Sequence, residues 1–397
     1  MKKFLSAGLI ALLAMTLVAG NVQAFAGWDK GFKLESDDGN FKMKIGGRSQ
    51  FQYTMQRMTG NQKTGATVAT TPADRFQHGF NFRRLRLQAT GTLYQKLDWF
   101  TILHTSTATT GNPNTTWFGG FTYNFVPEFY VSGGMVQIPL DRMGEDSSAW
   151  YLGVEAPLTA TQEDGLKDLT IARSSFGAPF DLGIRFDGDL GKRFSYALGV
   201  GNGEGFKNTN VNNELNWGVR LQVNALDAAP FKQTDFEWSE DPKLSFGVGN
   251  AFEAENAADG NVAGLTRDWS WTMSGDTAFR YRGFSLNAEI YHRTIRLNGS
   301  SIEDTNNDNK LMDNGYYANI GYYLIPKKLE AMLTAAQIFR EGPDNNANEF
   351  GTGLNWYIHE NDVKLQFDYT NVLDYDDIAG LNNATYHRFR WMFSMFL

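Results

Sequence analysis

The chain has 397 residues and a formal net charge of -8, and this acidic balance excludes a protein that holds nucleic acid through its phosphates. It contains no cysteine, which excludes a small secreted domain held together by disulfides. A mean hydropathy of -0.39 excludes a chain built mainly of membrane-spanning helices.

The first residues have the pattern of a secretory signal peptide. Two lysines precede an uncharged apolar run at residues 5–19, and small residues before Ala24 and Ala26 offer two cleavage positions. The apolar run is near the short end of what crosses a bilayer as a helix. We therefore expect a signal peptide at 1–24 and an exported domain at 25–397.

Hydrophobicity in the exported part alternates with a period of two. In the last segment, Phe389, Trp391 and Phe393 occupy one face, whereas Arg388 and Arg390 occupy the other. Weak alternating segments separated by turn residues are typical of outer-membrane β-barrels. About sixteen such segments are predicted, near residues 41–56, 80–93, 96–107, 116–125, 128–138, 180–189, 193–201, 214–226, 243–254, 269–281, 283–297, 315–324, 328–340, 348–358, 362–373 and 385–397.

The connections between these segments alternate between long and short. Outer-membrane barrels have long external loops and short periplasmic turns, and an even strand count returns both chain ends to the periplasm. The sequence therefore predicts an all-β protein, a transmembrane antiparallel barrel in the bacterial outer membrane. Long polar links are expected at 58–77, 298–314 and 374–384, and short ones at 94–95, 126–127, 281–282, 325–327 and 359–361.

Two connections depart from the pattern. Residues 226–243 form a long segment where a short turn is expected, and residues 139–179 form the longest link of all. From its length alone, this third external loop can either fold into the barrel or extend outward.

The lumen is predicted to be basic. A charge on the lipid face costs about 2–4 kcal/mol at the bilayer midplane, so charged positions in the strands should point inward. Acidic residues with the inward parity are few: Asp187, Asp276, Glu289 and Asp368. The candidate anion-binding residues are Lys44, Arg48, Arg84, Arg86, Arg185, Arg220, Arg280, Arg388 and Arg390, and the same parity is shared by Lys42, Arg293 and Lys364.

A basic lumen lowers the barrier to anions, and the planar guanidinium fork of arginine suits carboxylate and phosphate oxygens. Taken singly, each of these side chains is more often one that only lines a wet wall, paired with an acid, and it is their summed bias that favours anions. Lys42 and Arg293 lie near strand ends, where they can face lipid headgroups.

A family resemblance is carried by five stretches in a fixed order. They are GFKLESDDGNFKMKIGGRSQ (31–50), FNFRRLRLQATG (80–91), GGMVQIP (133–139), YALGVGNGEG (196–205) and WGVRLQV (217–223). In order and spacing they resemble the phosphate-selective porin O and P family, and the resemblance covers essentially the whole exported chain. It implies a homotrimer of sixteen-stranded barrels, an inward-folded third loop, and conduction of small anions, among them phosphate.

The resemblance makes the third loop a constriction loop, with Arg142, Glu145, Asp146 and Lys167 as its charged residues. Gln137 stands where the family often has a basic residue, and the loop itself carries acids. Phosphate preference is therefore left open.

Three functions remain in view at this point. The first is an anion-favouring diffusion porin, and the second is a weakly selective porin in which arginines and acids form a transverse field. The third is a plugged barrel that serves as an adhesin or an enzyme. No catalytic set and no metal-ligand spacing is recognisable, so neither enzymatic activity nor a metal or cofactor is predicted.

Overall fold

The computed structural model describes residues 24–28, 31–64, 67–107, 113–157, 176, 180–203, 214–254, 266–298, 309–340, 346–375 and 381–396. The predicted signal peptide, except for its last residue, lies outside these ranges, and so does Lys167 with much of the predicted third loop.

Nearly all of the described chain is β-strand. One α-helical turn, α2 (Arg142–Glu145), and one 3-10 turn, η1 (Ser148–Trp150), lie in the third loop. The strands are β1 (Ala24–Trp28), β2 (Phe32–Ser36), β3 (Phe41–Thr64), β4 (Thr67–Leu93), β5 (Leu97–Thr107), β6 (Pro113–Val126), β7 (Phe129–Gln137), β8 (Phe180–Leu190), β9 (Phe194–Gly201), β10 (Asn216–Asn224), β11 (Lys243–Ala254), β12 (Thr266–Tyr281), β13 (Phe284–Asn298), β14 (Lys310–Ile325), β15 (Leu329–Arg340), β16 (Ala347–His359), β17 (Val363–Tyr375) and β18 (Leu381–Phe396).

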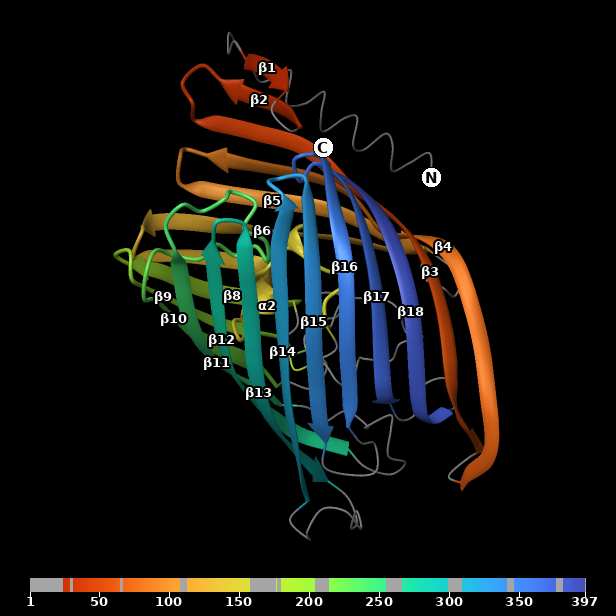
Figure 1. The fold of residues 1–397 in the computed structure, drawn as a ribbon. Helices are drawn as coiled ribbons and strands as arrows, with labels where there is room; N and C mark the ends of the chain where they lie inside the picture. The colour runs from red at the N-terminus through yellow and green to blue at the C-terminus, as the bar shows by residue number, and fades with distance from the viewer. Residues whose placement is uncertain are drawn as a thin grey trace, which may run out of the picture.

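Strands β3 to β18 form a closed antiparallel barrel of sixteen strands (Figure 1). Each strand pairs with the next along the chain, and β18 pairs back with β3 from Leu381↔Gln62 to Phe396↔Arg48. Closure leaves no free sheet edge, which is the condition for a sheet to span lipid. The predicted fold class is confirmed.

The hairpin β1–β2 was not predicted. The first part of β3 pairs with β2, for example Phe32↔Ile45, and the rest of β3 pairs with β18. Strand β2 thus continues the line of β18 beyond the end of the barrel. The turn between β2 and β3 is closed by Asp38, whose carboxylate accepts from the Ser36 hydroxyl at 2.6 Å and from the Asn40 backbone N–H at 3.0 Å.

The predicted short links are tight turns at one end of the barrel. Several use residues in the left-handed backbone region, including Tyr94 (φ 50°), Arg282 (φ 46°) and Glu360 (φ 48°). By the asymmetry of outer-membrane barrels, this end is the periplasmic one.

The predicted long link at 58–77 is wrong. There, β3 runs on to Thr64 and β4 begins at Thr67, and the two strands pair beyond Arg57 and Asp74, which form an exposed ion pair of 2.6 Å. Alternation identifies a strand only where its two faces differ in environment. The polar run at residues 59–64 shows no apolar alternation, so the sequence reads there as a loop.

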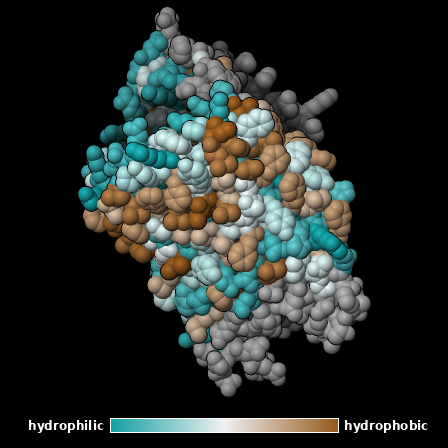
Figure 2. All heavy atoms as spheres, in the orientation of Figure 1, coloured by the Kyte–Doolittle hydropathy of each residue, from teal (hydrophilic) through white to brown (hydrophobic). Residues whose placement is uncertain are grey.

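The outer face of the barrel is apolar. Its exposed large side chains include Leu87, Trp117, Val248 and Leu333. Figure 2 shows hydrophobic residues gathered across the middle of the visible face, with hydrophilic ones above and below. Among the residues that the structure describes, no helix is long and apolar enough to span a membrane.

Candidate permeation pathway

The described part of the third loop, residues 138–157, lies against the inner wall of the barrel. It is bonded to inward side chains of β12, β13 and β17. These contacts are Ser274 to the Leu140 carbonyl (2.7 Å), the Met143 N–H to Glu289 (2.7 Å), Lys364 to the Ala149 carbonyl (2.7 Å) and the Val154 N–H to Asp368 (2.9 Å).

Short caps give this part of the loop its shape. Asp141 caps α2 by accepting from the Gly144 N–H at 3.2 Å, and it also accepts from the Tyr291 hydroxyl at 2.9 Å. Burial raises the pKa of Asp141 to about 6, although the Tyr291 hydroxyl and Arg220 oppose the shift. Ser147 caps η1 in the same way, accepting from the Ala149 N–H.

Arg83 and Arg84 hold the far end of the described loop through Glu155. A β-bulge in β4 pairs Gln50 with Arg84 and Phe51 with Phe82, so Arg83 is the extra residue and both arginines reach the lumen. Arg83 Nε lies 2.5 Å from Glu155 Oε1, and Arg84 Nη2 lies 3.1 Å from Oε2.

Burial disfavours the charged form of Glu155, but Arg83, Arg84 and Arg390 outweigh it and lower the pKa of Glu155 to about 2. The alternation rule assigned Arg83 to the lipid face, and this is why the sequence did not identify it. A bulge shifts the parity by one residue, and no local sequence signal marked it.

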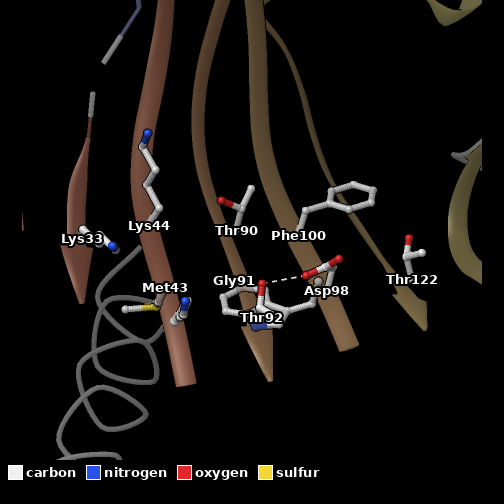
Figure 3. A pocket seen from close by; sticks show the side chains of 11 residues that line it. Lys33, Met43, Lys44, Thr90, Gly91, Thr92, Asp98, Phe100 and Thr122 are labelled. Atoms are coloured by element: carbon white, nitrogen blue, oxygen red, sulfur yellow. Dashed lines mark hydrogen bonds between the residues drawn. The ribbon is translucent and has the colours of Figure 1, made fainter. Parts of the chain in front are cut away.

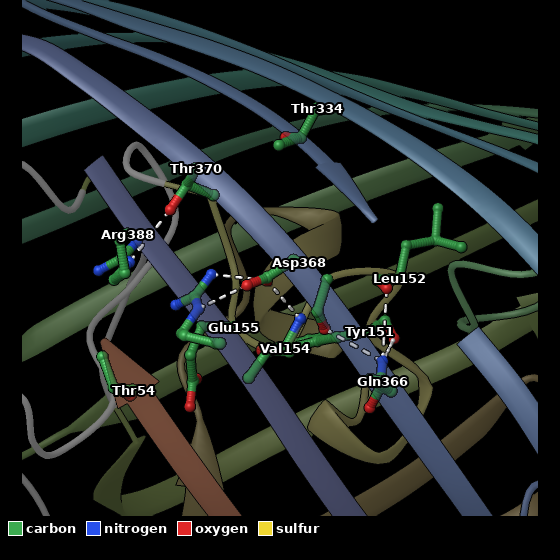
Figure 4. A network of polar contacts seen from close by, with 12 residues as sticks. Thr54, Tyr151, Leu152, Val154, Glu155, Thr334, Gln366, Asp368, Thr370 and Arg388 are labelled. Atoms are coloured by element: carbon green, nitrogen blue, oxygen red, sulfur yellow. Dashed lines mark hydrogen bonds and ion pairs between the residues drawn. The ribbon is translucent and has the colours of Figure 1, made fainter. Parts of the chain in front are cut away.

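A second network joins the loop to β17 and β18 (Figure 4). Arg390 donates to Asp368 from Nε (2.8 Å) and Nη2 (2.7 Å), and Asp368 also accepts from the Val154 N–H. Gln366 donates to the Tyr151 carbonyl at 3.1 Å. Strand and loop are therefore connected by shared acceptors rather than by single contacts.

The remaining predicted arginines also face the loop or the wall beside it. Arg48 donates to the Ser148 hydroxyl at 3.0 Å, and Arg388 donates to Thr370 at 3.1 Å. Arg185 pairs with Glu145 of the loop at 2.8 Å.

Arg220 pairs with Asp276. The sequence predicted that both side chains point into the lumen. Arg280 donates to the Lys232 carbonyl and to Asn287.

Burial raises the pKa of Asp146 to about 6, against the opposing charges of Arg142 and Arg280. Lys44 borders a cavity at the periplasmic end, and Arg86 faces Arg48 across β3 and β4.

The sequence undercounted the acids of the lumen. Buried carboxyl side chains also stand on β8, β14, β15 and β16, namely Asp181, Asp313, Glu330 and Glu349. The excess of basic over acidic side chains in the lumen is therefore smaller than predicted, and it is distributed unevenly over the strands.

Buried charges on β3, β4, β17 and β18 are Arg48, Arg83, Arg84, Lys364, Arg388 and Arg390 against Asp368. On β12 to β15 they are Asp276, Glu289, Asp313 and Glu330 against Arg280 and Arg293.

The long periplasmic segment noted in the sequence also enters the barrel. We call residues 229–239 the inner strut. Gln233 is its main contact with the loop: its N–H donates to the Trp150 carbonyl at 3.3 Å, and its side-chain oxygen accepts from the Leu152 N–H at 3.0 Å. Arg142 donates to the Ala229 carbonyl at 3.0 Å. The strut thus supports the third loop from the periplasmic side.

The strut is itself held by the wall. Thr234 donates to Glu330 at 2.6 Å, and Asp235 accepts from the Gly283 N–H at 2.7 Å. Its ring Phe236 lies 6.0 Å from Trp150 and 5.3 Å from Tyr357, measured between centroids. Within the described residues, no group of His, Asp and Glu side chains could hold a metal ion.

Comparison with known proteins supplies the remaining information. The chain is 24% identical to Porin O of Pseudomonas aeruginosa over 366 residues, which cover 85% of this chain and 76% of the relative. No protein-family model matches the chain. The closed sixteen-stranded barrel and the similarity to a porin together support one class of protein. The chain is an outer-membrane porin.

Solved structures show the same fold for this porin. An anion-selective porin from Comamonas acidovorans superposes with a TM-score of 0.58 at 12% identity, covering 90% of this chain and all of that one. The channel DcaP of Acinetobacter baumannii gives 0.54 at 11% identity, covering 94% and 100%. OmpT of Vibrio cholerae, solved in a trimer form, gives 0.52 at 12% identity, covering 90% and 99%.

The predicted resemblance, outer-membrane location and channel class are confirmed for this porin, which is a channel protein and not an enzyme. The roles of the individual arginines and acids stay predictions.

Glu155→Gln removes the charge that pairs with two arginines while keeping the shape of the side chain. We expect the preference for anions to rise, because Arg83 and Arg84 then lack a countercharge, and the stability of the barrel to fall by about 3–5 kcal/mol. Reversal potentials across planar bilayers in a KCl gradient and urea unfolding in lipid measure the two effects. Asp74→Asn removes an exposed acid of the outer hairpin and should change neither.

Gln233→Ala removes the strut's side-chain contact with the third loop. We expect larger and noisier single-channel currents, since the loop loses its contact with the strut on the periplasmic side. Glu240→Ala, at an exposed position of the same periplasmic segment, is the control. Identical current noise in the two variants would contradict a supporting role for the strut.

Anion preference should increase as pH falls through about 6, because protonation of Asp146 and Asp141 removes negative charge from the loop. Reversal potentials at about pH 7.5 and pH 5 measure this change. Asp146→Asn should reduce the pH-dependent change, and an unaltered pH dependence in this variant would assign it to other groups.

Proposed function

We propose that this porin is a water-filled diffusion channel that favours small anions. The observation that carries the proposal is the run of buried basic side chains on four adjacent strands, β17, β18, β3 and β4, where Asp368 is the one buried acid among the described strand residues. A wall of one sign attracts counterions and raises their concentration along it. Two of these cations bond to neutral groups: Lys364 to the Ala149 carbonyl and Arg388 to the Thr370 hydroxyl.

The loop reduces this preference. Glu155 neutralises part of the basic wall, and acids predominate among the buried charges of β12 to β15. This opposition is the specific observation that favours the second candidate, a weakly selective porin with a field directed across the pore. The two candidates differ in the size of the anion preference and not in the architecture.

Three finer features belong to the same proposal. The described part of the third loop bonds to inward side chains of β4, β8, β12 and β17, which supports a constriction there. The trimer form of the OmpT neighbour supports a homotrimer. The guanidinium groups near the pore make phosphate a candidate solute, although Arg84 already spends donors on Gln50 and Glu155.

Replacing Arg86 and Arg388 together by Gln tests the basic wall. We expect the chloride-to-potassium permeability ratio to fall by about two-fold or more, because two charges near the path are removed while hydrogen bonding is kept. Lys96→Gln, in an exposed periplasmic turn, is the matched control.

A native channel that prefers potassium would contradict the proposal. Block of the chloride current by added phosphate, measured on the same channels, tests phosphate as a solute. Block that is equal in the native protein and the double variant would count against these arginines as phosphate ligands.

A further inference from the structure

The inner wall of the barrel is covered unevenly. On β12 to β17 the inward side chains lie beneath the third loop and the strut. Many of them are 0–1% exposed, among them Arg280, Asn287, Glu289, Tyr317, Glu330 and Lys364. On β4 to β6 the inward side chains of Gln88, Thr90, Phe100, Ile102 and Phe118 are only half-buried. The open path among the described residues therefore follows β4 to β6 and is displaced from the barrel axis.

Strand register fixes which residues line this path. Arg48 points inward, since it bonds to Ser148 of the loop, and it pairs with Arg86, which pairs with His104. Two residues along each strand, the next inward row contains Gln88, Ile102 and Phe118, and the row after it contains Lys44, Thr90, Phe100 and Gly120.

Phe100, Ile102 and Phe118 form an apolar strip inside the lumen. Ile102 and Phe118 are directly opposed, which places them about 5 Å apart, and Phe100 lies diagonal to Phe118, a separation that an aromatic side chain can span. The Phe100 ring also extends over Gly120, where an added Cβ would lie 2.9 Å from the ring. The inner face of a water-filled barrel is ordinarily polar, so packing within the sheet does not explain an apolar strip there.

Cations border the strip on both sides. Arg86 lies one row toward the outer end of the barrel. On the periplasmic side, Lys44, Thr90, Phe100 and Thr122 line a cavity of about 440 Å³ (Figure 3).

The other lysines of the cavity are paired: Lys33 and Lys42 lie 2.7 and 3.0 Å from Glu35. Asp98, which also lines the cavity, keeps its charge and accepts hydrogen bonds from the neutral Thr92 hydroxyl at 2.6 Å and the Asn124 side-chain amide at 2.8 Å. Lys44 makes no ion pair with any described residue.

We propose that this path selects small organic anions that carry an apolar ring, of which aromatic carboxylates are the simplest. The ring contacts the strip formed by Phe100, Ile102 and Phe118, and the carboxylate faces Arg86 or Lys44. Contact with apolar side chains removes ring surface from water, and a carboxylate without a ring gains only the electrostatic part. This inference rests on the proposed anion preference and adds the substrate class.

The test compares benzoate with acetate, which have the same charge and differ in the ring. Their permeabilities relative to chloride follow from reversal potentials with one anion on each side of a bilayer that holds the full-length porin. A pore without the strip passes the larger benzoate more slowly than acetate. We expect the permeability of the native channel to benzoate to be about five-fold higher than its permeability to acetate.

Ile102→Thr and Phe118→Thr should each lower the benzoate-to-acetate permeability ratio several-fold. Leu103→Thr is the matched control, because it changes the neighbouring residue of the same strand on the lipid face and should leave the ratio as in the native channel. Heat-modifiable electrophoretic mobility confirms that each variant forms a folded barrel.

A native ratio at or below one, or a ratio unchanged in both lumen variants, would overturn the inference. A native channel that prefers potassium over chloride would instead overturn the proposed function. A ratio that falls equally in Leu103→Thr would assign the effect to the sheet as a whole and would also count against the strip.

Discussion

Every backbone N–H and C=O group that faces hydrocarbon must be paired within the protein, and the rest of this structure depends on that constraint. A sheet meets it only by closing on itself. Here closure is made by β3 and β18, which come from the two ends of the chain and pair over most of their length. Because the outer face must then be apolar, the charged side chains of the strands are confined to the interior. Loops and strands can therefore form ion pairs with one another there.

The interior is organised by two segments that enter from opposite ends. The third loop comes from the outer end and the strut from the periplasmic end, and Gln233 joins them near the middle. Together they cover the acidic wall and part of the basic wall. The inward side chains of β4 to β6, among them Thr90, Phe100 and Ile102, stay half-buried.

The sequence predicted the barrel, its strand number and its tight turns, because lipid on one face and water on the other impose alternation on every strand. It did not predict the β1–β2 hairpin or the extended end of β3 and β4, where polar residues such as Asn61 and Gln62 interrupt the alternation. It also missed Arg83, because a bulge reverses parity without a sequence signal. Asp313 was missed because the sequence placed it in the link at 298–314, whereas β14 begins at Lys310. Glu330 was missed because its strand neighbours gave no clear parity. Their partners, such as Thr234 and Arg293, are set by tertiary contacts that no local pattern encodes.

The seam between β3 and β18 has a consequence for the way the molecule assembles. Gln50 and Ser394, which hydrogen bond across it, are 344 positions apart, so the seam is among the most non-local contacts in the chain. Such contacts form late, because the entropy of closing a long loop must be overcome first. The third loop contacts Arg84 on one side of the seam and Asp368 near the other. Filling of the lumen and closure of the barrel are therefore coupled, because the loop bonds to strands on both sides of the seam and its contacts stabilise the closed sheet.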